Sequence, residues 1–262
     1  MESLLGLATG YRTTFLLVFF RLGAMLSVAP VVGHRSIPVP HRAGLAAMLA
    51  LVLTPVVGRA KVAGDDLFGL LFAIGGELLI GIAIGTVASL VVAAVHTASE
   101  LVGFQMGLGM GAVFDPTFGS NATVFTRLQE MLALLLFLAI DGHHALVLAV
   151  AGSFHRLAPG LAYSPEPLAG GLVSMGGDVF RAGLELSAPL VGVLFLVNVV
   201  MALLARVAPS MNVFALAMPI AVAVGLIAFL TLLPGSMTSM GRHFAAVPAD
   251  VTSLLLGGGR GR

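Results

Sequence analysis

The sequence has no cysteine and no tryptophan, and it has only two tyrosines. The absence of cysteine excludes disulfides, thiol catalysis and thiolate metal ligands. The shortage of Trp and Tyr removes most of the aromatic side chains that usually mark membrane interfaces. Charge is also scarce: 10% of the 262 residues are Asp, Glu, Lys or Arg, against about a quarter in soluble domains. The net charge of +1 gives no electrostatic basis for binding nucleic acid.

Hydrophobic residues are abundant instead, at 58% of the chain. A chain this apolar cannot bury its surface in one water-soluble core, so the composition predicts an all-α integral membrane protein. The apolar runs that we expect to be helical are residues 11–32, 43–57, 67–102, 125–140, 145–154, 179–204 and 213–233. We expect loops at 33–42, 58–66 and 155–178, and we expect Pro234-Gly235 to end the last helix.

Two of these runs have unusual lengths for membrane spans. Residues 43–57 are shorter than the ~20 residues that a span normally needs. Residues 67–102 would reach roughly 50 Å as one helix, well beyond the ~30 Å hydrocarbon core. Helices buried mainly by partner subunits would show both features.

The stretch between the third and fourth runs, residues 103–119, is rich in glycine and methionine. Gly occurs at 103, 107, 109, 111 and 119, Met at 106 and 110, and Asp115-Pro116 breaks the pattern. Glycine permits unusual backbone angles, and methionine supplies adaptable apolar surface. Non-helical backbone at membrane depth survives where protein buries it or where it lines a cavity. The stretch is therefore either a re-entrant or pore-lining loop, or a glycine-rich turn between two spanning helices.

Charged side chains within the apolar runs are the other candidates for function. Such residues usually pair with one another or line a pathway. The sequence therefore leaves two alternatives for them, namely structural ion pairs and a proton relay. The charged residues in question are Arg21, Glu77, Glu100, Asp115, Glu130, Asp141, Glu185 and Arg206. Adjacent His143 and His144 would point about 100° apart on a helix, which disfavours a metal site. No nucleophile elbow, phosphate loop, dinucleotide fingerprint or zinc-protease motif is present, so the sequence predicts no enzyme.

Four segments together resemble the FliR/SctT family of type III export-gate proteins. They are Gly-Glu-Leu-Leu-Ile-Gly at 76–81, Glu-Leu-Val-Gly-Phe-Gln-Met-Gly at 100–107, Asp115-Pro116, and Arg-Val-Ala-Pro-Ser-Met-Asn-Val-Phe at 206–214. The family usually has Arg-x-x-Pro-Gln-x-Asn at the last site, where Ser210 here replaces the glutamine. The order and spacing of the segments extend the resemblance over nearly the whole chain, and Gln-Met-Gly at 105–107 is closer to the flagellar branch.

The resemblance implies a subunit of the flagellar protein export gate in the bacterial inner membrane, within the flagellar basal body. It implies FliP-like and FliQ-like partner subunits, other export-apparatus proteins, unfolded export substrates in transit, and no cofactor or metal. It also implies long helical hairpins: a FliP-like part at 1–178, a FliQ-like hairpin at 179–235 and a C-terminal tail at 236–262.

In the family, the loop that matches residues 103–119 acts as a plug in the closed pore. The residues that would form this seal are Phe104, Met106, Gly107, Leu108, Gly109, Met110, Gly111, Val113, Phe114 and Phe118. The candidates for ion pairs or subunit contacts are Arg21, Glu77, Glu100, Asp115, Arg206 and Asn212.

Two other functions fit the same residues. One is a polytopic ion or small-molecule transporter that uses Arg21, Glu77 and Glu100 within the membrane. The other is a structural scaffold for FliP-like subunits.

Overall fold

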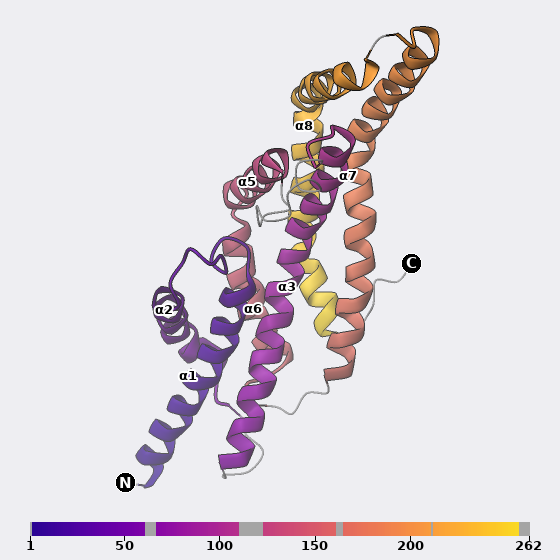
Figure 1. Ribbon diagram of the computed structural model, residues 1–262. Helices are drawn as coiled ribbons and strands as arrows, with labels where there is room; N and C mark the ends of the chain where they lie inside the picture. Colours follow the sequence, from indigo (N-terminus) through magenta and orange to yellow (C-terminus); the bar gives the residue numbers. More distant parts are fainter. Residues whose placement is uncertain (1, 61–66, 110–122, 161–164, 211, 257–262) are drawn as a thin grey trace. The chain divides into compact units, whose positions relative to one another are not determined.

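The computed structural model describes residues 2–60, 67–109, 123–160, 165–210 and 212–256 (Figure 1). All regular secondary structure in these residues is α-helical. The helices are α1 (Glu2–Val28), α2 (Val39–Val57), α3 (Leu67–Gln105), α5 (Val124–Ala139), α6 (Gly142–Arg156), α7 (Pro165–Val207) and α8 (Val213–Leu255).

The prediction of an all-α integral membrane protein is confirmed. In the described part of the chain, α1, α2, α3, α7 and α8 each contain a segment long and apolar enough to cross a membrane. The pair α5 and α6, interrupted at Ile140 and Asp141, would add a sixth span if counted as one. At the interruption, Asp141 has a φ of 57°, a left-handed conformation that ends one helix and starts the next.

Two predicted loops are shorter than expected, because prolines stand in the first turns of helices. α2 begins at Val39 with a proline in its first turn and is 19 residues long, so it is not too short to span. α7 begins at Pro165, so the expected loop at 155–178 is wrong over its second half. Proline is tolerated in the first turn because the N–H that it lacks would have no partner inside the helix.

The expected helix end at Pro234-Gly235 is also wrong, because α8 continues to Leu255. Two side chains bond to the helix around this point: Ser236 Oγ donates to the Leu232 carbonyl at 3.2 Å, and Thr238 Oγ1 to the Pro234 carbonyl at 2.9 Å. The segment expected to be a tail then buries a helical stripe of apolar residues, namely Phe244, Val247, Val251 and Leu254.

The chain forms two compact units, and each unit draws on distant parts of the sequence. Unit 1 comprises residues 1–90, 141–176 and 244–262, and unit 2 comprises 91–140 and 177–243. The long helices α3, α7 and α8 contribute to both units. The division into a FliP-like part at 1–178, a FliQ-like hairpin at 179–235 and a tail at 236–262 stays a prediction.

Unit 1 is built around α1, which lies beside α2 and packs closely on α3 (Figure 1). The close approach depends on the Gly-x-x-x-Gly formed by Gly81 and Gly85. A Cβ on Gly81 would lie 2.8 Å from Ala24 Cβ, and one on Gly85 would lie 2.7 Å from the Met25 carbonyl oxygen. Small residues at such spacing let two membrane helices approach each other.

Unit 2 contains the end of α3, all of α5, α7 from residue 177 onwards and α8 up to residue 243. Its core is a cluster of buried apolar side chains in which Phe125 and Phe229 meet edge to face, with ring centroids 5.1 Å apart. The members of this cluster are Val102, Met106, Phe125, Leu190, Leu194 and Phe229. The start of the glycine-rich stretch therefore belongs to the core of unit 2.

Candidate functional site

The candidate site is the base of the glycine-rich stretch, where α3 ends and α5 begins. Residues 103–109 of the stretch are described, whereas Met110, Gly111, Val113, Phe114, Asp115 and Phe118 lie outside the described residues. The site consists of a helix cap after α3, a buried methionine, and a set of polar contacts that hold the first turn of α5 against α3.

The helix cap is formed by residues 103–108. The Leu108 N–H bonds to the Gly103 carbonyl and the Gly107 N–H to the Phe104 carbonyl, both at 3.0 Å. This pair of bonds is a Schellman motif, which requires a left-handed residue just past the helix. Gly107 takes that position with a φ of 78°. A helix-ending turn therefore forms the first part of the stretch.

The cap sends neighbouring apolar side chains in different directions. Met106 is fully buried and packs on α8, where a Cβ added to Gly225 would lie 2.8 Å from Met106 Cε. Phe104 is 78% exposed and Leu108 is 37% exposed. Of the residues predicted to seal a pore, Met106 is therefore occupied within its own chain, while Phe104 and Leu108 remain accessible.

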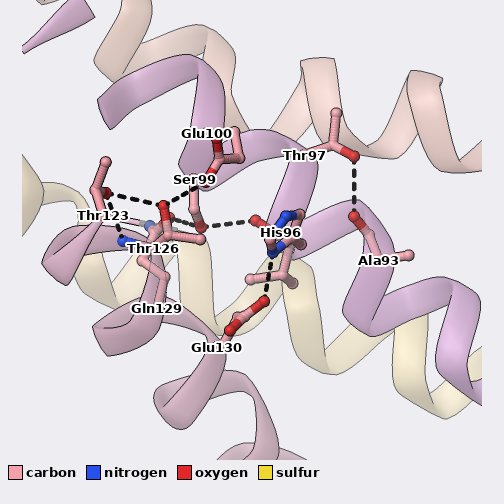
Figure 2. Close-up of polar contacts among 10 residues, drawn as sticks. Ala93, His96, Thr97, Ser99, Glu100, Thr123, Thr126, Gln129 and Glu130 are labelled. Atoms are coloured by element: carbon pink, nitrogen blue, oxygen red, sulfur yellow. Dashed lines mark hydrogen bonds and ion pairs between the residues drawn. The ribbon is translucent and has the colours of Figure 1, made fainter. Parts of the chain in front are cut away.

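The first turns of α5 are tied to the last turns of α3 by side-chain hydrogen bonds (Figure 2). His96 Nδ1 pairs with Glu130 Oε1, and Ser99 Oγ donates to Gln129 Oε1. One turn further along α3, Glu100 Oε1 accepts from Thr126 Oγ1 at 3.1 Å.

Thr123 completes this set at the N-terminus of α5. Its hydroxyl accepts the Thr126 N–H at 3.1 Å, as expected of an N-cap residue, and shares a hydrogen bond with Thr126 Oγ1 at 2.9 Å (Figure 2). A Cβ on Gly103 would lie 3.0 Å from Thr123 Oγ1, so α3 and the cap are in close contact. Gly103 at the end of α3 and Thr123 at the start of α5 are therefore in contact.

Sequence reasoning found only part of this polar set. It singled out Glu100 and Glu130, but it missed His96, Ser99 and Gln129. A signal was available, because positions 96, 99, 100 and 103 recur at helical spacing and carry polar or small residues within an apolar helix. The structure pairs Glu130 with His96.

The other candidate ion pair lies in unit 1 and joins Arg21 of α1 to Glu77 of α3. Arg21 is fully buried and donates Nη1 to Ser153 Oγ at 2.8 Å and Nη2 to the Leu157 carbonyl at 3.0 Å. Its guanidinium also lies 4.0 Å from the centroid of the Phe154 ring. The second oxygen of Glu77 accepts the Gly160 N–H at 3.0 Å.

These contacts satisfy both charges and link α1, α3, α6 and the turn that follows α6. Among the described residues, no buried side-chain nitrogen or oxygen lacks a hydrogen-bond partner. A buried ion pair without such partners would be strongly destabilising. The arrangement is thus suited to holding helices in register.

The remaining predicted contact residues lie at the connection between α7 and α8. Arg206 is exposed in the last turn of α7. Asn212 precedes α8, where its Oδ1 accepts the Ala215 N–H at 3.3 Å. Both positions belong to the Arg-x-x-Pro segment that carried part of the family resemblance.

Residues 12–247 match the family described as bacterial export proteins, family 1. The chain belongs to this family. It is 36% identical over 218 residues to flagellar biosynthetic protein FliR of Escherichia coli (strain K12), with 82% of each chain covered. The FliR of Bacillus subtilis (strain 168) is 32% identical over 216 residues, covering 81% of this chain and 83% of the relative.

A third relative, FliR of Aquifex aeolicus (strain VF5), is 30% identical over 238 residues, covering 89% of this chain and 90% of its own. The resemblance to the FliR family is therefore confirmed. As a bacterial export protein with membrane-spanning helices, this family member is a component of protein export.

Proposed function

We propose that this FliR-family protein is a subunit of the flagellar type III export gate in the bacterial inner membrane, where it forms the export pore with FliP-like and FliQ-like subunits. Unfolded export substrates pass through this pore on their way to the growing flagellum. The family match over residues 12–247 carries the proposal. The role is that of a gate in the basal body, with no chemical step.

The glycine-rich stretch at 103–119 supplies the seal of the closed pore. Rings of apolar side chains around a narrow channel resist wetting, and a seal must move to let a polypeptide through. The contact between Gly103 and Thr123 supports this role, because it holds the described residues on either side of 110–122 against the same part of α3. Phe104 and Leu108 are the described residues exposed for sealing, while Met106 is the internal anchor.

The partner subunits cover the apolar faces that this chain leaves open. On α7, exposed apolar side chains recur over most of the helix, and a single chain offers nothing among the described residues to cover them. Examples are Phe180, Leu184, Phe195, Leu196, Val200 and Leu203. Apolar faces of this kind mark subunit or lipid contacts. Arg206 and Asn212, at the exposed connection between α7 and α8, are the polar candidates for subunit contacts.

The transporter hypothesis needs charged groups that can bind and release ions. Arg21 and Glu77 are both buried, and both are occupied by each other and by Ser153, Leu157 and Gly160. Glu100 accepts a hydrogen bond from Thr126. This pattern favours structural ion pairs over a relay, so we do not propose transport of small ions.

The gate is tested by changing the stretch in a strain that depends on this protein for flagellum assembly. Deletion of 107–113 should let ions leak across the inner membrane, which a membrane-potential dye would report. Replacing Gly107, Gly109 and Gly111 with Ala should stiffen the stretch and reduce secretion of flagellar proteins into the medium.

The control is Gly75→Ala with Gly76→Ala, since a Cβ at either position in α3 meets open space. This control should secrete normally and keep the membrane tight. Normal tightness after the deletion, together with normal secretion by the stiffened variant, would rule out the seal at 103–119.

A further inference from the structure

The helices α6 and α8 of unit 1 enclose an apolar groove that shares Ser153 with the ion-pair network and no residue with the glycine-rich stretch. The groove holds about 470 Å³, which is within the range of pockets that bind small organic molecules. Its walls include Leu148 and Gly152 from α6 and Val251 and Leu255 from α8. Leu148 is 59% exposed, so the apolar wall is open to the surroundings.

The groove has a positive charge on its wall. His155 and Arg156, in the last turn of α6, both line it, and no carboxylate is among its lining residues. Arg156 reaches towards α8, where Nη1 lies 3.5 Å from the Thr252 carbonyl, the limit for a hydrogen bond. The guanidinium has several other N–H donors that could bind an anionic group.

The groove belongs to segments that are apolar enough to span a membrane. Basic pockets between membrane helices bind anionic lipid head groups. We propose that this groove binds an anionic phospholipid, with one acyl chain along Leu148, Gly152 and Val251 and the phosphate at Arg156 and His155. The charge of the wall favours this occupant over an apolar helix, which would leave Arg156 without an anionic partner.

The test uses the full chain purified in a neutral detergent, with native mass spectrometry to count bound lipid. Phosphatidylglycerol should bind more tightly than phosphatidylcholine with the same acyl chains. Inorganic phosphate alone should not displace it, because phosphate lacks the chain that fills the groove. Arg156→Gln should weaken phosphatidylglycerol binding about fivefold, whereas Arg156→Lys should largely retain it.

A second variant tests the acyl-chain wall. A Cβ at Gly152 meets open space, so Gly152→Leu should fill the groove without a clash and abolish binding of phosphatidylglycerol. The matched controls are Arg35→Gln, an exposed charge outside the groove, and Gly170→Leu, whose Cβ also meets open space on α7. Both controls should bind lipid as the unchanged protein does.

Equal binding of the two lipids to the unchanged protein would overturn the proposal without reference to any variant. So would complete displacement of phosphatidylglycerol by inorganic phosphate, or an equal effect of Arg156→Gln and Arg35→Gln. Capture of a polypeptide instead of a lipid by a photoreactive side chain at position 152 would also overturn it and would assign the groove to a partner helix.

Discussion

Arg21 and Glu77 are 56 positions apart in the sequence and form an ion pair inside unit 1, where both side chains are buried. The pair does not stand alone, because Ser153, Leu157 and Gly160 occupy the remaining polar atoms. Isolated charges are unfavourable within a membrane, but here the two charges and their partners connect α1, α3 and α6.

Removing one partner of this pair should destabilise the protein strongly. Arg21→Met leaves the Glu77 carboxylate buried and without its charge partner, which should cost about 3–5 kcal/mol. The double variant Arg21→Met with Glu77→Leu should lose less free energy of unfolding than Arg21→Met alone, because it leaves no buried charge without a partner. Thermal or chemical unfolding of the purified protein in detergent measures both.

The control for this prediction is Arg181→Met, which breaks the exposed pair of Arg181 with Glu185 on α7. Exposed pairs of this kind contribute about 0–1 kcal/mol, so the change should be small. Equal losses of stability for Arg21→Met and Arg181→Met would contradict a structural role for the buried pair.

Gly81→Ala should separate α1 from α3. The new Cβ would lie 2.8 Å from Ala24 Cβ and still closer to the backbone carbonyl of Arg21, which cannot rotate away. Overpacking of this kind typically costs about 1–3 kcal/mol. Unfolding experiments should show this loss, and because Arg21 is part of the same contact, its ion pair should weaken with it.

The matched control is Gly76→Ala in the same helix, since its Cβ meets open space. Alanine favours helix over glycine by about 0.5–1 kcal/mol, so this variant should be neutral or slightly more stable. If both variants behaved alike, the close packing of α1 on α3 would not be what requires glycine at 81.

Gly225→Ala should disturb the base of the glycine-rich stretch through Met106. The Cβ would lie within 3.0 Å of Met106 Cγ, Sδ and Cε, so the methionine must change its conformation or leave the core. We expect a loss of about 1–2 kcal/mol, because methionine is flexible enough to absorb part of the clash. Hydrogen exchange should increase at residues 106–108.

Met106→Ala should remove most of that clash while creating a cavity in the cluster around Phe125 and Phe229, at a cost of about 2–5 kcal/mol. The double variant Met106→Ala with Gly225→Ala should therefore lose less stability than the sum of the two single changes. Gly192→Ala, whose Cβ meets open space on α7, serves as the control. Strict additivity would show that Met106 and Gly225 are not coupled.

Thr123→Ala should loosen the start of α5. The change removes the N-cap hydrogen bond to Thr126 and the hydroxyl contact with Thr126 Oγ1, for a loss of about 0.5–2 kcal/mol. Faster hydrogen exchange in the first turn of α5, without a change in α1, is the expected result.

Thr238→Ala is the comparison for this change, because Thr238 bonds only to a carbonyl within its own helix. A hydroxyl that bonds back to its own helix contributes little to stability, so the variant should stay close to the unchanged protein. If Thr123→Ala left hydrogen exchange in the first turn of α5 unchanged, the Thr123 N-cap would not be what stabilises the start of this helix.

The sequence by itself determined the class of the protein and most of its helices. Long apolar runs with few charges required membrane helices, because a chain so apolar has no soluble alternative. The four motif segments at 76–81, 100–107, 115–116 and 206–214 were enough to identify the family, since order and spacing survive where overall identity is low.

Prolines were the main source of local error. The sequence predicted a loop at Pro165 and a helix end at Pro234. In the structure, Pro165 begins α7 and Pro234 lies inside α8. Whether a proline ends a helix also depends on packing, and α8 continues past Pro234 and buries Phe244, Val247 and Val251.

Only the tertiary structure decided which side chains meet. The sequence marked Arg21, Glu77 and Glu130 as candidates for pairs, but it could not supply Ser153, Gly160 or His96 as their partners. It also could not separate buried Met106 from exposed Phe104, which are two residues apart at the end of α3. Periodicity reports the local conformation of one segment, whereas burial and pairing depend on which distant segments pack against it.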